Sequence, residues 1–262
     1  MPSKLGRLLR PVIPDGIFEN LGQWYSRYLH DPDFAVFDAL ANAQGLVLDV
    51  GANRGHSAIS VLRHTDRLRV FSIEPNHEHK WDLLLLKLLH PLRFRFRVMA
   101  AGNTHAQKVL FIPGDLQLRQ SARASLDPAE FERSHTKARL LELGIDCNDE
   151  NAIRQINAQV VPLDTLKLSP DLIKLDVEGY ELQALQGLQE TLTNHLPALL
   201  IEANHPHKWL PLILSLGYQI YFLNHSSQAL NKVESFDGII NIFCLHDHSK
   251  SKITQVLGQM VD

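Results

Sequence analysis

Short apolar runs alternate with longer amphipathic stretches along most of the chain. The runs predict strands, and the stretches, in which apolar positions recur every three or four residues, predict helices. Such alternation is typical of an α/β protein with a mostly parallel sheet and helices on both faces. The predicted strands are 46–50, 69–73, 94–100, 108–112, 171–177, 198–202, 218–223 and 239–245, and the predicted helices are 56–64, 77–90, 128–143, 180–193 and 209–216.

Two of these patterns predict where strands lie in the sheet. In 94–100, arginines alternate with apolar residues, which indicates one exposed face and hence an edge strand. The segment between 218–223 and 239–245 is too short and polar for a crossover helix, so these strands are expected to pair antiparallel. We therefore expect the sheet to end in an antiparallel hairpin.

The same patterns divide the chain into regions. Residues 1–44 are expected to form a short, partly helical cap, and 45–262 a single α/β domain. The polar stretch 113–158, with its one predicted helix, interrupts the alternation. An insertion of this length between core strands usually serves as a lid or substrate wall.

Composition narrows the class of protein. With 262 residues, 45% of them apolar and 21% charged, the chain resembles an ordinary globular protein rather than a disordered one. A net charge of −3 gives no basic field for nucleic acid. No apolar run approaches the roughly 20 residues of a membrane span, and no signal peptide is evident. Cys147 and Cys244 fit no zinc or disulfide pattern. We expect a cytoplasmic protein with no membrane or nucleic-acid partner.

The segment from Asp49 to Ser57 follows a predicted strand and opens a helix. Its glycines, Gly51 and Gly55, allow a ligand to approach the backbone at the end of a parallel strand. Asn53 stands where a dinucleotide-binding loop needs its second glycine, which disfavours NAD. The chain also lacks the loop that binds nucleoside triphosphates. Asn53 tolerates the left-handed conformation that such turns often need.

A second acid, Glu74, ends the next predicted strand. One strand-helix-strand unit separates it from Asp49, so both acids are expected along the same sheet edge. One of the two carboxylates can bind an amino group or the ribose next to it, and the other can accept hydrogen bonds from both ribose hydroxyls. The pattern favours a nucleoside without phosphates, and S-adenosylmethionine meets that description.

Four motifs in this order resemble the FkbM-type family of S-adenosylmethionine-dependent methyltransferases. They are DVGANRG at 49–55, IEPN at 73–76, VPLDTL at 161–166 and DLIKLDVEGYE at 171–181. The resemblance implies the class I methyltransferase (Rossmann-like) fold, with a seven-stranded sheet whose last strand is antiparallel. It also implies O-methylation of a hydroxyl on a sugar or secondary metabolite.

The resemblance assigns roles by position. It implies that Asp49, Gly51, Asn53 and Gly55 form the cofactor loop, which Ser57 continues. It implies that Glu74 binds the ribose, that Asn76 lies at the adenine side, and that Asp176 lies near the methionine part. The family's serine pair is matched only loosely, by Ser121 and Ser125.

Methyl transfer to an alcohol requires alignment of the reacting atoms and a base for the hydroxyl proton. The catalytic candidates are Asp176 and Glu178 after one strand and Glu202 and His205 after the next. His205 is the favoured base because the usual pKa of histidine lies near neutrality. Three carboxylates and a histidine also suit a divalent cation, although we predict no metal site.

Several alternatives stay open at this stage. A nucleoside-binding module without turnover and an N-methyltransferase of the same fold fit the same motifs, whereas a nicotinamide oxidoreductase fits the loop poorly. The chain has no NPPY-like motif for base methylation. We expect a small-molecule or glycan acceptor, whose identity the sequence does not give. The sequence is equally silent on the oligomeric state.

Overall fold

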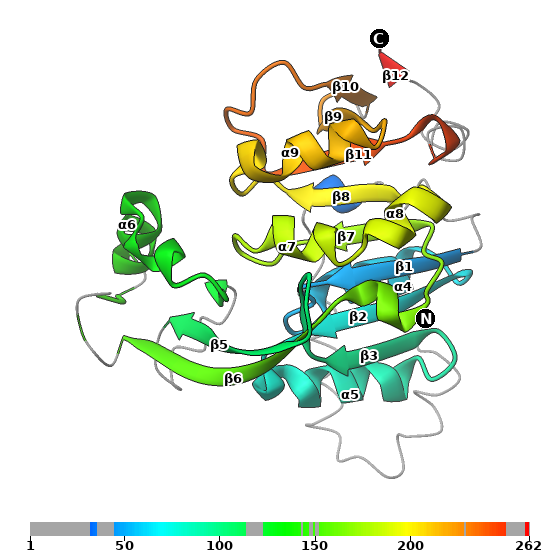
Figure 1. Ribbon diagram of the computed structural model, residues 1–262. Coiled ribbons are helices and arrows are strands. Elements are labelled where there is room, and N and C mark those ends of the chain that lie inside the picture. Colours follow the sequence, from blue (N-terminus) through cyan, green and yellow to red (C-terminus); the bar gives the residue numbers. More distant parts are fainter. Residues whose placement is uncertain are drawn as a thin grey trace.

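A large mixed sheet runs through the centre of the molecule (Figure 1). The computed structural model describes residues 32–35, 45–113, 123–142, 144–146, 149, 152–227, 229–249 and 260–261. Within these residues the sheet has nine strands. In spatial order they are β12 (Met260–Val261), β10 (Ala229–Lys232), β9 (Gln219–Asn224), β11 (Asn241–Leu245), β8 (Ala198–Glu202), β7 (Leu172–Leu175), β1 (Gly45–Val50), β2 (Leu68–Glu74) and β3 (Phe94–Val98).

The five strands β8, β7, β1, β2 and β3 pair in parallel. Their apolar runs are buried because both faces of the sheet are covered. Val47 of β1 packs in the core on one face, whereas Leu48 and Val50 pack in the core on the other. Since successive side chains of a strand point to opposite faces, one apolar run supplies both cores.

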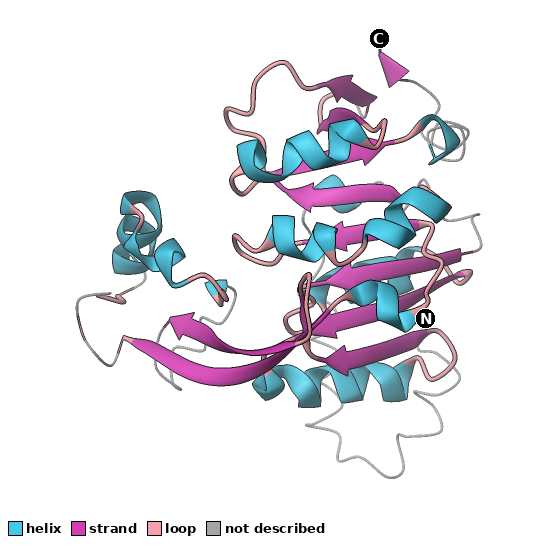
Figure 2. Ribbon diagram, viewed as in Figure 1, coloured by secondary structure: helices cyan, strands magenta, loops and turns pink. Residues whose placement is uncertain are grey.

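Helices cover both faces, as the sequence predicts (Figure 2). Leucines and isoleucines of α4 and α5 line one core, and apolar residues of α7, α8 and α9 line the other. The first core is extended by Phe34, which lies in the short 3₁₀ helix η1 (Pro32–Ala35). The helices are α4 (His56–His64), α5 (Lys80–Leu89), α7 (Glu181–Gln186), α8 (Gln189–His195) and α9 (Pro206–Ser215), with 3₁₀ turns η2 (His77–His79) and η5 (Leu163–Leu166).

A smaller sheet extends from the side on which the parallel strands end (Figure 1). Its strands, in spatial order, are β4 (Ala100–Ala101), β6 (Ile153–Val161) and β5 (Ala106–Pro113). Between β5 and β6 the chain forms η4 (Pro128–Glu132) and α6 (Ser134–Glu142). Phe131 and Leu140 of these helices form a small core with Ile145. The insertion therefore has a small core of its own and lies beside the end of the main sheet.

Several details of the predicted topology are corrected. The sheet has nine strands rather than seven, because β10 and β12 continue it beyond β9. The last two predicted strands, found as β9 and β11, do pair antiparallel, but β10 lies between them along the chain and β11 inserts between β8 and β9. They do not form the expected terminal hairpin. The insertion is also shorter than predicted, because β6 occupies 153–161.

Other predictions are confirmed or fall outside the described residues. β3 is an edge strand, as its alternating arginines predict. The helix predicted at 128–143 is divided into η4 and α6. Most of the predicted cap at 1–44, as well as Ser121 and Cys147, lies outside the described residues. Among the residues that are described, none of the helices has the length and apolar character needed to traverse a bilayer.

Candidate active site

The loop after β1 turns sharply between the ends of three strands. Gly51, Asn53 and Gly55 all have left-handed backbone conformations, with φ of 82°, 50° and 87°. The N–H of Gly51 donates to the carbonyl of Ile73 on β2 at 2.9 Å. A Cβ on Gly51 would lie 1.6 Å from the carbonyl oxygen of Asp176. Only glycine fits there, and the left-handed turn expected at Asn53 is confirmed.

The buried carboxylate of Asp49 stabilises this loop through hydrogen bonds. Its side chain is 1% exposed, and its two carboxylate oxygens accept hydrogen bonds from Ser57 Oγ at 2.6 Å and Ser72 Oγ at 2.8 Å. Ser57 lies in the first turn of α4, and Ser72 lies on β2. Asp49 therefore connects three elements, and its carboxylate is already engaged by protein groups. Direct contact of Asp49 and Ser57 with a cofactor stays a prediction.

Glu74 lies at the end of the neighbouring strand β2. One carboxylate oxygen accepts the N–H of Asn53 at 2.6 Å and the other accepts the N–H of Asn76 at 2.8 Å. Burial raises the pKa of Glu74 to about 7, and these two hydrogen bonds offset only part of that effect. Each oxygen can accept a further hydrogen bond. The predicted placement of Glu74 beside the glycine loop is thus found.

Asn76 is also buried, and its side chain caps the turn after Glu74. Its Oδ1 accepts the N–H of Glu78 at 3.0 Å, and its Nδ2 lies 3.4 Å from Nε2 of His79. The side chain therefore orders the start of η2. Its predicted place at the adenine side stays a prediction.

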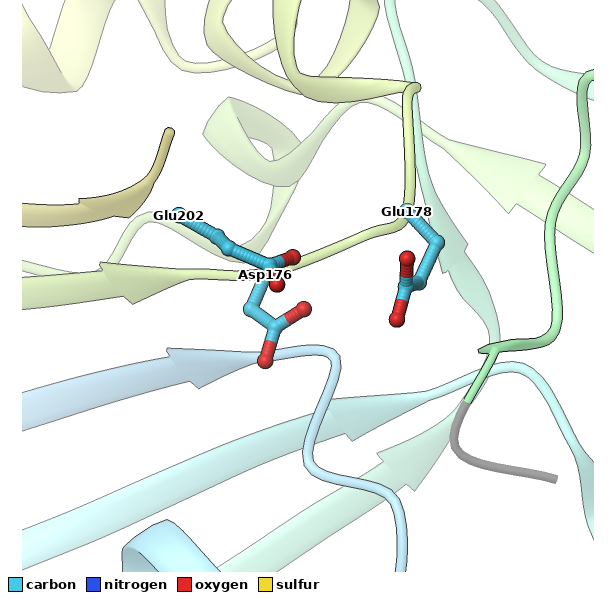
Figure 3. A group of neighbouring side chains, drawn as sticks. All are labelled: Asp176, Glu178 and Glu202. Carbon is cyan, nitrogen blue, oxygen red and sulfur yellow. The ribbon is translucent and has the colours of Figure 1, made fainter. Parts of the chain in front are cut away.

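Three acidic side chains meet beside this loop (Figure 3). Asp176 and Glu178 follow β7, and Glu202 ends β8. One carboxylate oxygen of each lies within 4.8 Å of those of the other two. The sequence prediction that these three candidates share one edge of the sheet is consistent with this arrangement. Ionised carboxylates at this spacing repel one another, which raises the pKa of those without a cationic partner.

Lys174 determines which of the three acids stays ionised. It is 7% exposed, and its Nζ donates to Asp176 at 2.8 Å and to the carbonyl of Gly51 at 3.3 Å. Burial opposes its charge, yet the carboxylates of Asp176 and Asp49 outweigh burial and hold the pKa of Lys174 above its ordinary value. Although burial favours its neutral form, Asp176 has a lowered pKa because Lys174 is beside it. Asp176 and Lys174 form an ion pair in which the lysine is buried and the carboxylate is partly exposed.

The pKa values of the other two acids, Glu202 and Glu178, are raised instead of lowered. Burial, followed by the charges of Asp176 and Glu178, raises the pKa of Glu202 to about 11. Glu202 is therefore protonated near neutrality and shares its proton with Asp176, while its Oε2 accepts from Asn204 at 2.6 Å. Burial and the charge of Asp176 raise the pKa of Glu178 to about 8. Near neutral pH the Lys174 ammonium offsets the Asp176 carboxylate, the Glu202 carboxyl is protonated and the Glu178 carboxyl is mostly protonated. The expectation that no metal binds here stays a prediction.

His205 faces the insertion. Its Nε2 lies 3.2 Å from Glu130 Oε2 and also contacts the Arg133 guanidinium, which pairs with Glu130. Burial and the charge of Arg133 lower the pKa of His205 to about 4. A ring nitrogen engaged in this way is poorly placed to take a proton from a substrate. The geometry thus favours Glu178 over His205 as the base.

Sequence reasoning assigned no role to Lys174, Glu130 or Arg133. Lys174 carries a usable signal, because it is the charged residue within the otherwise apolar strand β7, and a buried charge needs a partner. Glu130 and Arg133 carry no such signal. They belong to a polar stretch whose packing against the loop after β8 depends on the tertiary fold.

Comparison with known proteins agrees with the motifs. The family described as the methyltransferase FkbM domain matches residues 49–247. The chain belongs to the FkbM methyltransferase family. A comparison with curated proteins finds no match.

Three solved structures illustrate how distantly this FkbM-family chain is related to proteins of known structure. The methyltransferase FkbM from Methylobacillus flagellatus KT is 18% identical, with a TM-score of 0.48, over 88% of this chain and 60% of that one. This chain thus spans less than two thirds of that protein. A precorrin-6y C5,15-methyltransferase from Geobacter metallireducens GS-15 is 12% identical, with a TM-score of 0.43, over 82% and 87% of the two chains. A putative caffeoyl-CoA O-methyltransferase from Staphylococcus aureus is 13% identical, with a TM-score of 0.39, over 93% and 98%.

Proposed function

We propose that this FkbM-family protein uses S-adenosylmethionine to methylate a hydroxyl group on a sugar or small metabolite. The observation that carries the proposal is the position of Glu74. Its buried carboxylate, tied by backbone N–H groups of Asn53 and Asn76, lies beside the glycine loop. An acid there is suited to accept hydrogen bonds from the two ribose hydroxyls.

The residues present fit this cofactor. Glu74 keeps acceptor capacity on both oxygens, and the loop carries no phosphate-binding motif. When bound, S-adenosylmethionine supplies an electrophilic methyl group on a sulfonium. Asn53, Gly55 and Glu74 would seat the adenosine part. Asp176, already ionised beside Lys174, would lie towards the cationic methionine part.

Glu178 would act as the base. Its pKa of about 8 places it near the pH at which a carboxylate both accepts a proton readily and is partly ionised. The Glu178 carboxylate would accept the proton that the acceptor hydroxyl loses when its oxygen takes the methyl group and the carbon–sulfur bond breaks, which releases S-adenosylhomocysteine. Glu202 keeps its own proton on the side of Asp176, so it does not compete for this role.

Two measurements test the proposal. Calorimetry with S-adenosylhomocysteine should show binding, and Glu74→Ala should weaken it by about 1 to 3 kcal/mol through lost charge-assisted hydrogen bonds. Glu190→Ala, which removes an exposed carboxylate on α8, is the matched control and should bind normally. Equal affinity in wild type and Glu74→Ala would contradict the assignment of the cofactor site.

The acceptor requires a separate screen. A labelled methyl donor, offered together with glycan and metabolite fractions, should label hydroxyl groups and release S-adenosylhomocysteine. Labelling of amines alone would assign N-methylation instead. Cofactor binding without transfer to any fraction would favour a nucleoside-binding module.

A further inference from the structure

The turn that carries Glu178 has an unusual backbone. Glu178 has φ of 51° and Gly179 has φ of 95°, so two consecutive residues are left-handed. For a residue with a side chain this conformation is strained, and it persists only where the surroundings hold it. The direction of the Glu178 carboxylate therefore depends on contacts from outside the turn.

A serine of the insertion supplies the contact on Glu178 itself. Ser125 Oγ donates to the carbonyl oxygen of Glu178 at 2.6 Å, although 53 residues separate the two. Ser125 is fully buried, and its backbone exchanges hydrogen bonds with Phe111 of β5 at 2.9 and 3.0 Å. Its Oγ also accepts the N–H of Asp127 at 3.0 Å. The hydroxyl is thus oriented by the insertion and directed at the turn.

Two further contacts hold the second residue of the turn. The carboxylate of Glu181 accepts the N–H of Gly179 at 3.0 Å. Glu130 lies so close that a Cβ on Gly179 would be 2.8 Å from its Oε2. These contacts fix Gly179, whereas the carbonyl of Glu178 is held by Ser125.

We propose that Ser125 is a positioning residue that fixes the Glu178 turn and so directs its carboxylate towards Asp176 and Glu202. The inference rests on the proposed function, in which Glu178 is the base. It extends that function because it connects the insertion, which is expected to form a wall of the acceptor site, to the proposed base Glu178. The same stretch of insertion contacts the loop after β8 through Glu130 and His205, so the loops after β7 and β8, which both carry catalytic candidates, are held from one side.

The test follows the Glu178 carboxylate directly and needs no acceptor. Protein labelled with ¹³C at glutamate carboxyls is titrated by NMR, and Glu178→Gln identifies the Glu178 resonance. In Ser125→Ala the apparent pKa of Glu178 should move by about half a unit or more towards the ordinary value, because a loosened turn admits water. Glu74, followed in the same sample, should titrate as in wild type. Ser125→Cys, which keeps the size but donates weakly, should give a smaller shift.

Ser60→Ala is the matched control. Ser60 is a buried serine of α4 whose Oγ has no hydrogen-bond partner among the described residues, so its loss should leave Glu178 unchanged. An unchanged Glu178 titration in folded Ser125→Ala would overturn the inference. Equal shifts of Glu178 and Glu74 would also overturn it, because they indicate general loosening. If Ser125→Ala does not fold, an unchanged titration in Ser125→Cys decides against it.

Failure of the proposed function gives a different result. Wild-type protein that does not bind S-adenosylhomocysteine in calorimetry would remove the methyltransferase proposal, whatever Ser125 does. Normal binding in both wild type and Ser125→Ala, with a shifted Glu178 titration in the variant alone, supports both the function and the positioning role.

Discussion

Glu74 and Asn53 are joined by a hydrogen bond of 2.6 Å from the Asn53 N–H to a buried carboxylate oxygen. This contact ties the glycine loop after β1 to the end of β2, so the turn proposed to bind the cofactor and the acid are positioned together. The same carboxylate has a pKa of about 7 because burial disfavours its charge. Its ionisation state therefore changes within the pH range in which the protein can be studied.

Cofactor affinity should depend on pH through Glu74. Ribose hydroxyls donate to the ionised carboxylate, so binding favours the charged form and releases a proton below pH 7. Affinity for S-adenosylhomocysteine should fall as pH decreases from about 8 to 6, by at most about tenfold per pH unit. Calorimetry in buffers of different ionisation enthalpy would measure the released proton. Glu74→Gln should bind weakly at every pH, and a persistent pH dependence in that variant would assign the effect to another group.

Gly51 should be indispensable for a steric reason as well as a conformational one. Gly51→Ala puts a Cβ 1.6 Å from the Asp176 carbonyl oxygen, in a backbone with φ of 82°. We expect a loss of more than about 3 kcal/mol of unfolding free energy, above the usual cost of a left-handed residue. Gly144→Ala is the control, because Gly144 has φ of 81° and no atom within 4 Å of its Cβ position. Urea unfolding should show a clearly smaller loss for Gly144→Ala, and equal losses would refute the clash.

Much of this architecture follows from local pattern. The runs at 46–50 and 198–202 form β1 and β8, because three or four consecutive apolar positions suit a strand buried on both faces. The strand β6 was missed, although Gln155, Asn157 and Gln159 are exposed and alternate with apolar neighbours. That period-two signal lies in a polar stretch, whose composition favours a loop over a strand.

The chemistry of the site follows much less from sequence. Asp176 lies in the motif at 171–181 and Glu202 lies outside the four motifs, so the sequence does not show that one proton is shared between them. Proton sharing depends on side chains meeting within 4.8 Å beside a buried lysine. For the same reason His205 was favoured as the base. Its usual pKa is visible in the sequence, whereas its contact with Glu130 is a product of the fold.

The raised pKa of Glu202 predicts a stabilising substitution. The folded state keeps Glu202 protonated up to a pKa of about 11, whereas the unfolded chain ionises near the model-peptide value of 4.5. Its contribution to stability is thus full below pH 4.5 and is lost as pH rises above that value. Glu202→Gln resembles the protonated form, and its amide can still meet Asp176 and Asn204.

Urea unfolding at two pH values tests this expectation. Glu202→Gln should be more stable than wild type by about 1 to 3 kcal/mol at pH 7.5 and about equally stable at pH 4. Glu234→Gln, an exposed acid in the loop after β10, is the control and should show little change at either pH. Destabilisation by Glu202→Gln at pH 7.5 would show that Glu202 is ionised in the folded protein.

Lys174 should contribute strongly to stability through its pair with Asp176. Lys174→Met removes the cation from a carboxylate whose side chain is 34% exposed, so we expect a loss of about 1 to 3 kcal/mol, between the costs of breaking an exposed and a fully buried pair. Lys167→Met is the matched control, because Lys167 forms an exposed pair with Glu190 at 3.2 Å and such pairs contribute less than about 1 kcal/mol. Denaturant unfolding at pH 7.5 measures both. A loss in Lys174→Met no larger than that in Lys167→Met would show that the pair is well solvated.

The identity of the base can be decided by comparing Glu178 with His205. Once the screen has supplied an acceptor, Glu178→Gln should lower kcat by about 10² to 10⁴, the usual contribution of general base catalysis, with unchanged affinity for S-adenosylhomocysteine. The wild-type rate should rise with pH through about 8, because the carboxylate must be ionised to accept the hydroxyl proton. His205→Asn should retain that pH profile, since the histidine pKa of about 4 leaves it neutral throughout. A large loss in His205→Asn together with an active Glu178→Gln would restore the histidine as the base.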